Sequence, residues 1–197
     1  MGGRRKTIYF YQTLPTVSFR KIPVMGGKSI EVVPGWEWGT QNNAGVDPEQ
    51  KRIVYTRMDR GLAAATMLRD IQSGKETAFT LPLLRCRWSH DGKFVAGSYF
   101  PGGQWKQSEI QVCTVADNTF EKIVSGYFPK WAEDDSRLFY AANGDFVGTE
   151  VWSVSRDGTE PRKAAELHPI TSVNNFFAVS QGRIVWVRFE QSKSSCG

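Results

Sequence analysis

The sequence contains few histidines and cysteines, and it has no long apolar run. Two histidines and three cysteines occur among its 197 residues. The odd number of cysteines argues against a disulfide framework, and Cys86 and Cys113 lie within apolar patterns typical of small core residues. No stretch approaches the roughly 18 apolar residues of a membrane span, and the N-terminus lacks the apolar core of a signal peptide. As it stands, the chain is expected to be soluble and cytoplasmic, without membrane insertion.

Helix-forming runs and one-sided charge are also scarce. The segment from Gly61 to Met67 holds three alanines and is too short to be stable as an isolated helix. The 25 basic and 20 acidic residues give a net charge of +5, and Arg4-Arg5-Lys6 is the only basic run. Because no basic stripe with interleaved aromatic residues occurs, we expect no nucleic-acid partner.

The sequence has no recognisable arrangement of catalytic residues. An enzyme requires a nucleophile and a base, paired carboxylates or metal ligands in one place. His90 lies in a predicted turn, His168 leads into a predicted strand, and no G-x-S-x-G motif is present. We therefore predict that this chain is not an enzyme, with no catalytic residue and no cofactor.

Three patterns that resemble ligand sites have simpler interpretations. Cys86 and His90 flank a predicted strand end without a second pair of ligands, so no zinc site is expected. The run Glu133-Asp134-Asp135 lacks the alternating oxygen spacing of a calcium loop and is predicted to be a solvated turn. The pairs Gly26-Gly27 and Gly102-Gly103 are not followed by a helix that would hold a phosphate, so they are predicted to be turn residues.

The dominant positive feature is a repeat. A turn followed by an apolar strand recurs at residues 2, 47, 89, 132 and 178, at spacings of 45, 42, 43 and 46, which is close to the period of a β-propeller blade. The residues six positions later each open an apolar strand, namely Ile8, Ile53, Val95, Leu138 and Ile184. Such continuously apolar strands are typical of sheets that are covered on both faces. A large apolar residue that would plug between blades precedes the turn, as Val46, Trp88, Trp131 and Phe177.

Each copy continues with a second strand pair. The predicted turns of these pairs are Met25-Gly26-Gly27, Ser73-Gly74, Asp117-Asn118 and Asp157-Gly158, all of which tolerate a positive φ. Residues 1–34 then supply three strands of one blade, residues 35–82, 83–125 and 126–168 form complete four-stranded blades, and residues 169–197 supply the first two strands of another. We predict an all-β fold in which residues 1–197 form one partial propeller domain. Incomplete blades expose sheet edges, so self-association is expected.

Two of the turns carry a resemblance to a known family. Residues Trp88-Ser89-His90-Asp91-Gly92-Lys93 and residues 131–136 resemble the WD40-like (PD40) repeat of TolB-type propellers, whose turn is W-S-P-D-G-K. The segment Val151-Trp152-Ser153-Val154 with Asp157-Gly158 matches the second half of that repeat, and residues 19–27 are similar to another copy. The resemblance implies an incomplete propeller of the six-bladed TolB-like type found in bacterial proteins.

This chain departs from the family pattern in its turns. Proline is replaced by His90, Glu133 and Val179, and glycine is replaced by Gln50 and Asp135. We expect the turns to keep their chain reversal with less favourable local chemistry.

The resemblance implies a scaffold rather than a reaction. It favours a non-catalytic propeller for protein–protein interaction or ligand sensing, although neither a protein partner nor a small ligand is identified by it. In similar proteins the propeller is often joined to a Pal-binding domain, a serine/threonine kinase, a winged-helix regulator or a serine peptidase. The alternative is therefore a C-terminal accessory or sensor propeller of an enzyme or regulator whose catalytic or DNA-binding part is not in this chain. A full-length TolB-like parent could be periplasmic, and a truncated reading frame without independent function is a third alternative.

The two faces of the predicted disc differ in their connections. The turns described above lie on one face, and the longer loops and the links between blades lie on the other, which is where recognition usually occurs. Exposed aromatic residues would be the anchors of such a face. The predicted binding residues are Trp36, Trp38, Tyr99, Phe100, Trp105, Asn143, Asp145 and Phe146. Packing on an inner strand is an equal alternative for Trp36 and Trp38, and Trp105 is the best placed to reach solvent.

Overall fold

The computed structural model describes residues 7–12, 17–36, 44–58, 64–142, 150–166 and 177–186. Apart from two short 3-10 turns, η1 (Pro101–Gly103) and η2 (Trp105–Gln107), the regular structure within these residues is strand. None of the helical segments in the described ranges is long and apolar enough to cross a membrane. The described part of the chain is therefore all-β.

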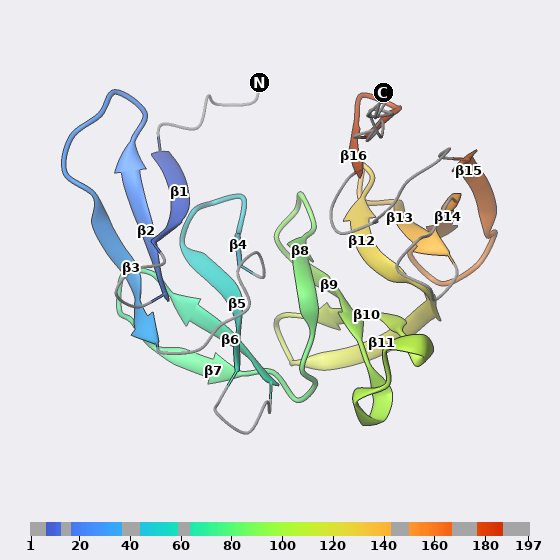
Figure 1. The fold of residues 1–197 in the computed structure, drawn as a ribbon, viewed down its shortest axis with the longest axis horizontal. Helices are drawn as coiled ribbons and strands as arrows, with labels where there is room; N and C mark the ends of the chain where they lie inside the picture. Colours follow the sequence, from blue (N-terminus) through green and yellow to red (C-terminus); the bar gives the residue numbers. More distant parts are fainter. Residues whose placement is uncertain are drawn as a thin grey trace, which may run out of the picture.

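Five antiparallel sheets follow one another along the chain (Figure 1). The first sheet holds β1 (Thr7–Gln12), β2 (Val17–Pro23) and β3 (Ile30–Trp36), and the last holds β16 (Phe177–Ser180) and β17 (Arg183–Trp186). Between them lie three four-stranded sheets: β4 (Gly45–Val46), β5 (Arg52–Met58), β6 (Ala64–Asp70) and β7 (Glu76–Ala78); β8 (Leu84–Trp88), β9 (Phe94–Tyr99), β10 (Glu109–Thr114) and β11 (Thr119–Ser125); β12 (Tyr127–Trp131), β13 (Arg137–Ala142), β14 (Glu150–Ser155) and β15 (Arg162–Glu166). Three complete blades thus lie between two partial ones, which confirms the predicted fold class.

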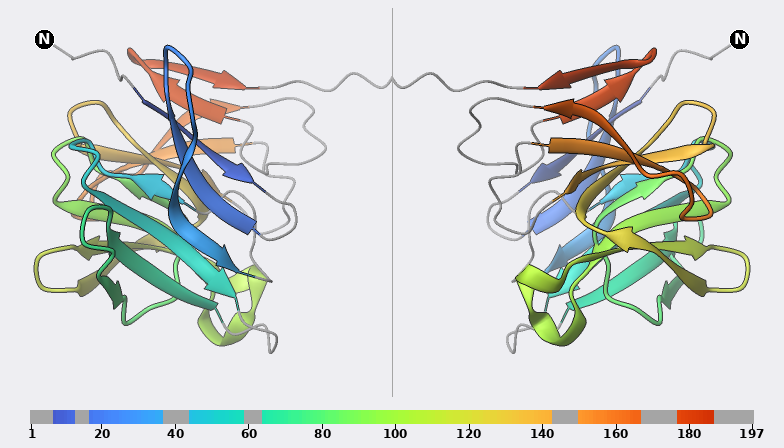
Figure 2. Two further views of the ribbon diagram at one scale, coloured as in Figure 1. Left: turned by 90° about the vertical axis from the view of Figure 1, so that its left-hand side faces the viewer. Right: turned by 90° about the vertical axis from the view of Figure 1, so that its right-hand side faces the viewer.

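The first strands of the later blades lie side by side near a common centre. Strand β8 contacts both β4 and β12, and β12 contacts β16. Strand order within each complete blade follows the sequence, so each blade extends outward from its first strand (Figure 1). Figure 2 shows the tight hairpin turns on one face of this arrangement and the two 3-10 turns on the opposite face. The longer loop between β9 and β10 thus lies on the face opposite the hairpin turns, and the other loops predicted for that face fall largely outside the described residues.

The core lies between adjacent blades. The second strands open with Ile53, Val95 and Leu138, and all three of these side chains are completely buried. Ile8 takes the same place in the first sheet but is 49% exposed. Apolar strands are thus fully covered where a blade has described neighbours on both sides, as the continuous apolar pattern predicts.

The large residues before the turns join each blade to the preceding one. The indole Nε1 of Trp88 donates a hydrogen bond to the carbonyl oxygen of Gly45 at 2.9 Å, and that of Trp131 donates to the carbonyl oxygen of Arg87 at 2.9 Å. Each tryptophan therefore satisfies its polar atom on the first strand of the neighbouring blade while its ring packs between the sheets. This confirms the predicted plug role for both tryptophans.

The prediction for Phe177 is right about its packing and wrong about its position. Phe177 is 2% exposed and packs with Phe128, Ala141 and Val151 of the preceding blade, as a plug between blades should. It begins β16 and pairs with Trp186, however, whereas Trp88 and Trp131 end their strands. The last hairpin turns within Gln181-Gly182, whose φ values are 49° and 69°, while the earlier signature turns need five residues. Two consecutive residues with positive φ reverse the chain in the shortest possible loop, so the alignment of the repeat shifts in this copy.

Candidate binding site

The predicted aromatic anchors differ in how far the structure describes them. Tyr99 and Phe100 follow one another at the end of β9, and both are half-buried. The Phe100 ring centroid lies 6.2 Å from that of Tyr127, so part of Phe100 packs between two blades. The backbone of Trp36 ends β3 and that of Trp105 begins η2. Trp38, Asn143, Asp145 and Phe146 lie outside the described residues, and the whole set stays a prediction.

A groove of about 400 Å³ lies between the blade β8–β11 and the blade β12–β15. Its lining residues include Lys106, Ser108, Gly126, Tyr127, Tyr140 and Trp152. The loop-rich face contributes Lys106 of η2 and Gly126, which links β11 to β12, whereas Tyr127, Tyr140 and Trp152 belong to strands β12, β13 and β14. Tyr127 and Tyr140 are each 4% exposed and Trp152 is half-buried, so Trp152 offers most of the aromatic surface beside the exposed Lys106. Apolar surface with few polar groups is typical of ligand pockets.

The floor of the groove depends on Gly126. A Cβ atom at this position would lie 2.5 Å from Cδ2 of Tyr140, which is too close for any other residue. Two hydrogen bonds hold Gly126 in place. Its N–H donates to the carbonyl oxygen of Ser108 at 3.0 Å, and the Ser108 hydroxyl donates to the carbonyl oxygen of Gly126 at 2.8 Å. The link between the blades is therefore held against the groove wall rather than free to close it.

Tyr140 and Trp152 form a cross-strand pair within this wall. They are direct partners on β13 and β14, and the indole Nε1 of Trp152 donates to Glu150 Oε2 at 2.9 Å. Tyr140 is 4% exposed, and its burial raises the pKa of its phenol. The sequence analysis missed Lys106, Tyr127, Tyr140 and Trp152 as a group because it searched the loops for anchors. The signal it could have used is that the aromatic partners stand at matching positions of two predicted strands.

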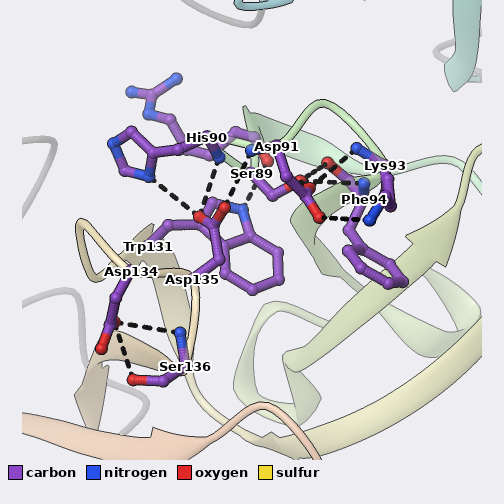
Figure 3. A network of polar contacts seen from close by, with 10 residues as sticks. Ser89, His90, Asp91, Lys93, Phe94, Trp131, Asp134, Asp135 and Ser136 are labelled. Carbon is purple, nitrogen blue, oxygen red and sulfur yellow. Dashed lines mark hydrogen bonds and ion pairs between the residues drawn. The ribbon is translucent and has the colours of Figure 1, made fainter. Parts of the chain in front are cut away.

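On the opposite face, polar contacts join the turn after β8 to the turn after β12 (Figure 3). Oδ1 of Asp135 accepts the N–H of His90 at 2.8 Å and lies 2.9 Å from its Nδ1, and Oδ2 accepts the N–H of Asp91 at 2.9 Å. Asp134 Oδ1 accepts the hydroxyl of Ser136 at 2.7 Å and its N–H at 3.1 Å. These carboxylates shape the turns, and the histidine is part of the same structural network.

The described cysteines are poor nucleophiles. Burial raises the pKa of both the Cys86 and the Cys113 thiol to about 12, and each side chain is completely buried. Both remain free thiols. Within the described ranges, no three histidine, cysteine or acidic side chains lie close enough to hold a metal ion. His168 and Cys196 lie outside those ranges.

Comparisons with known proteins concern the fold. No family model matches the sequence, and the search of curated proteins finds no relative. TolB from Acinetobacter baumannii is similar in structure, with a TM-score of 0.68 and 17% identity over 85% of this chain and 41% of TolB. An oligogalacturonate lyase from Vibrio parahaemolyticus gives a TM-score of 0.63 and 13% identity over 82% of this chain and 50% of the lyase. The β-propeller domain of the Trilobed protease from Pyrococcus furiosus gives a TM-score of 0.57 and 10% identity over 84% of this chain and 56% of that domain. The chain therefore has the fold of a TolB-like β-propeller and spans less than two thirds of the length of these proteins.

Proposed function

We propose that this propeller is a non-catalytic binding scaffold and that its ligand, a protein segment or a small molecule, binds in the groove between the blades β8–β11 and β12–β15. The observation that carries the proposal is the aromatic lining of a 400 Å³ groove on the loop-rich face. Aromatic side chains in a concave site supply most of the affinity of typical interfaces. Here all three come from one complete blade, Tyr127 from β12, Tyr140 from β13 and Trp152 from β14, so this wall of the site is formed before a ligand arrives.

The chemistry of the described residues supports binding over catalysis. His90 is engaged by Asp135, and the thiols of Cys86 and Cys113 are buried with raised pKa values. A reaction would need a nucleophile and base within reach of one another in a pocket. None of these candidate groups lines the proposed groove.

The alternative is that the propeller accompanies an enzyme or a regulator. Two observations favour this alternative. The similar domain from Pyrococcus furiosus is the propeller of a protease, and this chain spans only part of each similar protein. The groove would then receive a substrate or partner of the larger protein. The same binding experiment applies to both alternatives, because both place the contact on the loop-rich face.

Selection from a displayed library of random peptides tests the proposal. Peptides that bind the folded chain are synthesised, and their affinity is measured by fluorescence anisotropy. Lys106→Ala and Trp152→Ala should each weaken binding by about fivefold or more, as expected for contacts at the centre of an interface. Lys75→Ala removes an equally exposed lysine on another blade and should leave the affinity unchanged. Equal affinity in the wild type and both groove variants would refute the proposed site.

A further inference from the structure

Strands β8 and β12 carry the same irregularity at the centre of the propeller. The pairing of β8 with β9 shifts between Leu84 and Arg87, and the pairing of β12 with β13 shifts between Tyr127 and Lys130. Such bulges change the direction in which the following side chains point. Arg87 and Lys130 are the first paired residues after the two bulges, so they occupy equivalent positions on adjacent blades.

Aromatic rings of the next blade lie beside Arg85 and Lys130. Arg85, within the first bulge, has its guanidinium carbon 5.6 Å from the ring centroid of Phe128 on β12. Lys130 has its Nζ 5.9 Å from the ring centroid of Phe177 on β16. Both distances fit cation–π interactions, which hold a positive charge without neutralising it. Arg85 and Lys130 hold different positions on their strands, so these are two separate contacts between adjacent blades.

The charges of Arg85, Arg87 and Lys130 act on one another, and two of the three have no carboxylate partner among the described residues. Burial, together with the charges of Arg87 and Arg85, lowers the pKa of Lys130 to about 7. Burial also lowers the pKa of Arg87, whose Nη1 donates to the carbonyl oxygen of Cys86 at 2.9 Å. In the part of the chain that the structure describes, no acidic side chain forms an ion pair with Arg87 or Lys130. Half-buried charges of one sign are costly unless an opposite charge reaches them.

A cavity reaches Arg87 of this cluster, while Arg85 and Lys130 are not among its lining residues. The cavity has a volume of about 580 Å³ and lies between the first three blades. Its lining includes Tyr11 of β1, Gly45 of β4 and Arg87 of β8, and no acidic residue is among the described residues that line it. A ligand in the cavity would therefore meet the charge of Arg87 directly, and Lys130 holds the equivalent position on the neighbouring strand β12.

We propose that Arg87 and Lys130, with Arg85 beside them, bind a small oxyanion that carries at least two negative charges, such as a phosphate ester or a polycarboxylate. The planar guanidinium of Arg87 matches two oxygens of such a group, and the ammonium of Lys130 supplies a second point of charge. A bound dianion would replace the repulsion among the cations by attraction. This site shares no residue with the groove of the proposed function, so either proposal can fail without the other.

Binding of a phosphate monoester, glycerol phosphate, and of citrate tests the inference. Isothermal titration is carried out at about pH 6.5, where Lys130 is largely protonated and the monoester, whose second pKa is about 6, is largely a dianion. The ionic strength is constant, chloride is the monovalent control, and anion concentrations of about 10 mM detect millimolar dissociation constants. Arg87→Met and Lys130→Met should each weaken binding about tenfold or more, as expected for the loss of a charge-assisted hydrogen bond. Lys75→Met removes one positive charge elsewhere and should bind as the wild type does.

Each outcome of the titration is decisive. Binding of glycerol phosphate alone identifies a phosphate-ester site, and binding of citrate alone identifies a polycarboxylate site. Arg87→Lys keeps the charge but loses the planar fork, so it should bind more weakly than the wild type and more tightly than Arg87→Met. If Arg87→Met does not fold, the anion affinity of Lys130→Met decides the question. Lys130→Met removes a charge that its neighbours repel, so it should be at least as stable as the wild type. No binding of either anion to the wild type, or equal affinity in the folded Lys130→Met variant, would overturn the inference.

Discussion

Asp135 accepts hydrogen bonds from the turn of the neighbouring blade, where the backbone N–H of His90 is 2.8 Å from its Oδ1 (Figure 3). Asp135 stands where the resembling repeat has glycine, and it adopts the φ of 57° that such a position needs. His90 stands where that repeat has proline, which has no N–H to donate. The two departures from the repeat are therefore one interaction between blades, rather than two less favourable turns.

Comparable contacts join the other blades on the turn face. Oε1 of Glu133 accepts the N–H of Gln181 at 2.8 Å, which links the fourth blade to the last. Nη2 of Arg52 donates to the carbonyl oxygen of Gly92 at 3.0 Å, and its guanidinium carbon lies 4.8 Å from the ring of Trp88. Neighbouring blades are thus connected through polar side chains as well as through their apolar cores.

Restoring the proline of the repeat should destabilise the protein. His90→Pro removes the N–H that Asp135 accepts, and we expect the free energy of unfolding to fall by about 1–2 kcal/mol, the usual cost of a hydrogen bond to a charged group. The backbone itself tolerates proline, because Pro48 occupies the equivalent position in the turn after β4. Urea denaturation measures the change. His90→Ala keeps the N–H and is the matched control, so a His90→Pro variant at least as stable as His90→Ala would contradict the contact.

The two departures should also be coupled energetically. Asp135→Gly relieves the positive φ but removes the acceptor of His90 and Asp91. In a double-mutant cycle with His90→Pro, we expect the second substitution to cost less in the presence of the first, with a coupling free energy of about 1 kcal/mol. The same denaturation experiment on the single and double variants supplies all four values. Simple additivity would show that Asp135 and His90 act independently.

Lys130 should make stability depend on pH in a defined direction. Burial and the charges of Arg87 and Arg85 lower its pKa to about 7 in the folded state, from 10.5 for an exposed lysine. Between these values the unfolded chain binds a proton that the folded chain has released, so the free energy of unfolding should rise with pH from about pH 7 to about pH 8. Above that range the buried thiols oppose the trend, because their raised pKa values keep protons on the folded state. Denaturation at several pH values checks the slope, which should become smaller in Lys130→Met; an unchanged slope would assign it to other groups.

Self-association through the incomplete blades is a further prediction. The first sheet has three described strands and the last has two, whereas complete blades have four. Edge strands are templates for pairing with another chain. Sedimentation velocity should therefore show an average mass that increases with concentration. A single monomeric species across the concentration range would exclude association through these sheets.

The sequence predicted the architecture well because the repeat is encoded locally. The apolar residues near the start of the second strands, such as Ile53 and Leu138, and turn residues such as Gly158 recur at similar spacings, and each determines its own hairpin. The predicted position of Phe177 was wrong because the Gln181-Gly182 turn is shorter than the others. Contacts between blades could not be predicted from the sequence, since the packing of Tyr140 against Gly126 depends on how two hairpins approach each other. The positive cluster was also missed. Arg87 and Lys130 each precede the tryptophan of a signature turn and so recur at the spacing of the repeat, but the bulges before them leave no pattern in the sequence.

The most direct test of the binding account is a nuclear magnetic resonance titration of the folded, isotopically labelled chain with a peptide selected for binding. We predict that the amide resonances of Lys106, Ser108 and Gly126 and the indole N–H of Trp152 shift on binding, because they line the groove. Resonances of the turn face, such as those of His90 and Asp91, should stay unchanged. Shifts confined to the turn face, with the groove resonances unmoved, would contradict the claim that the loop-rich face is the binding surface of this propeller.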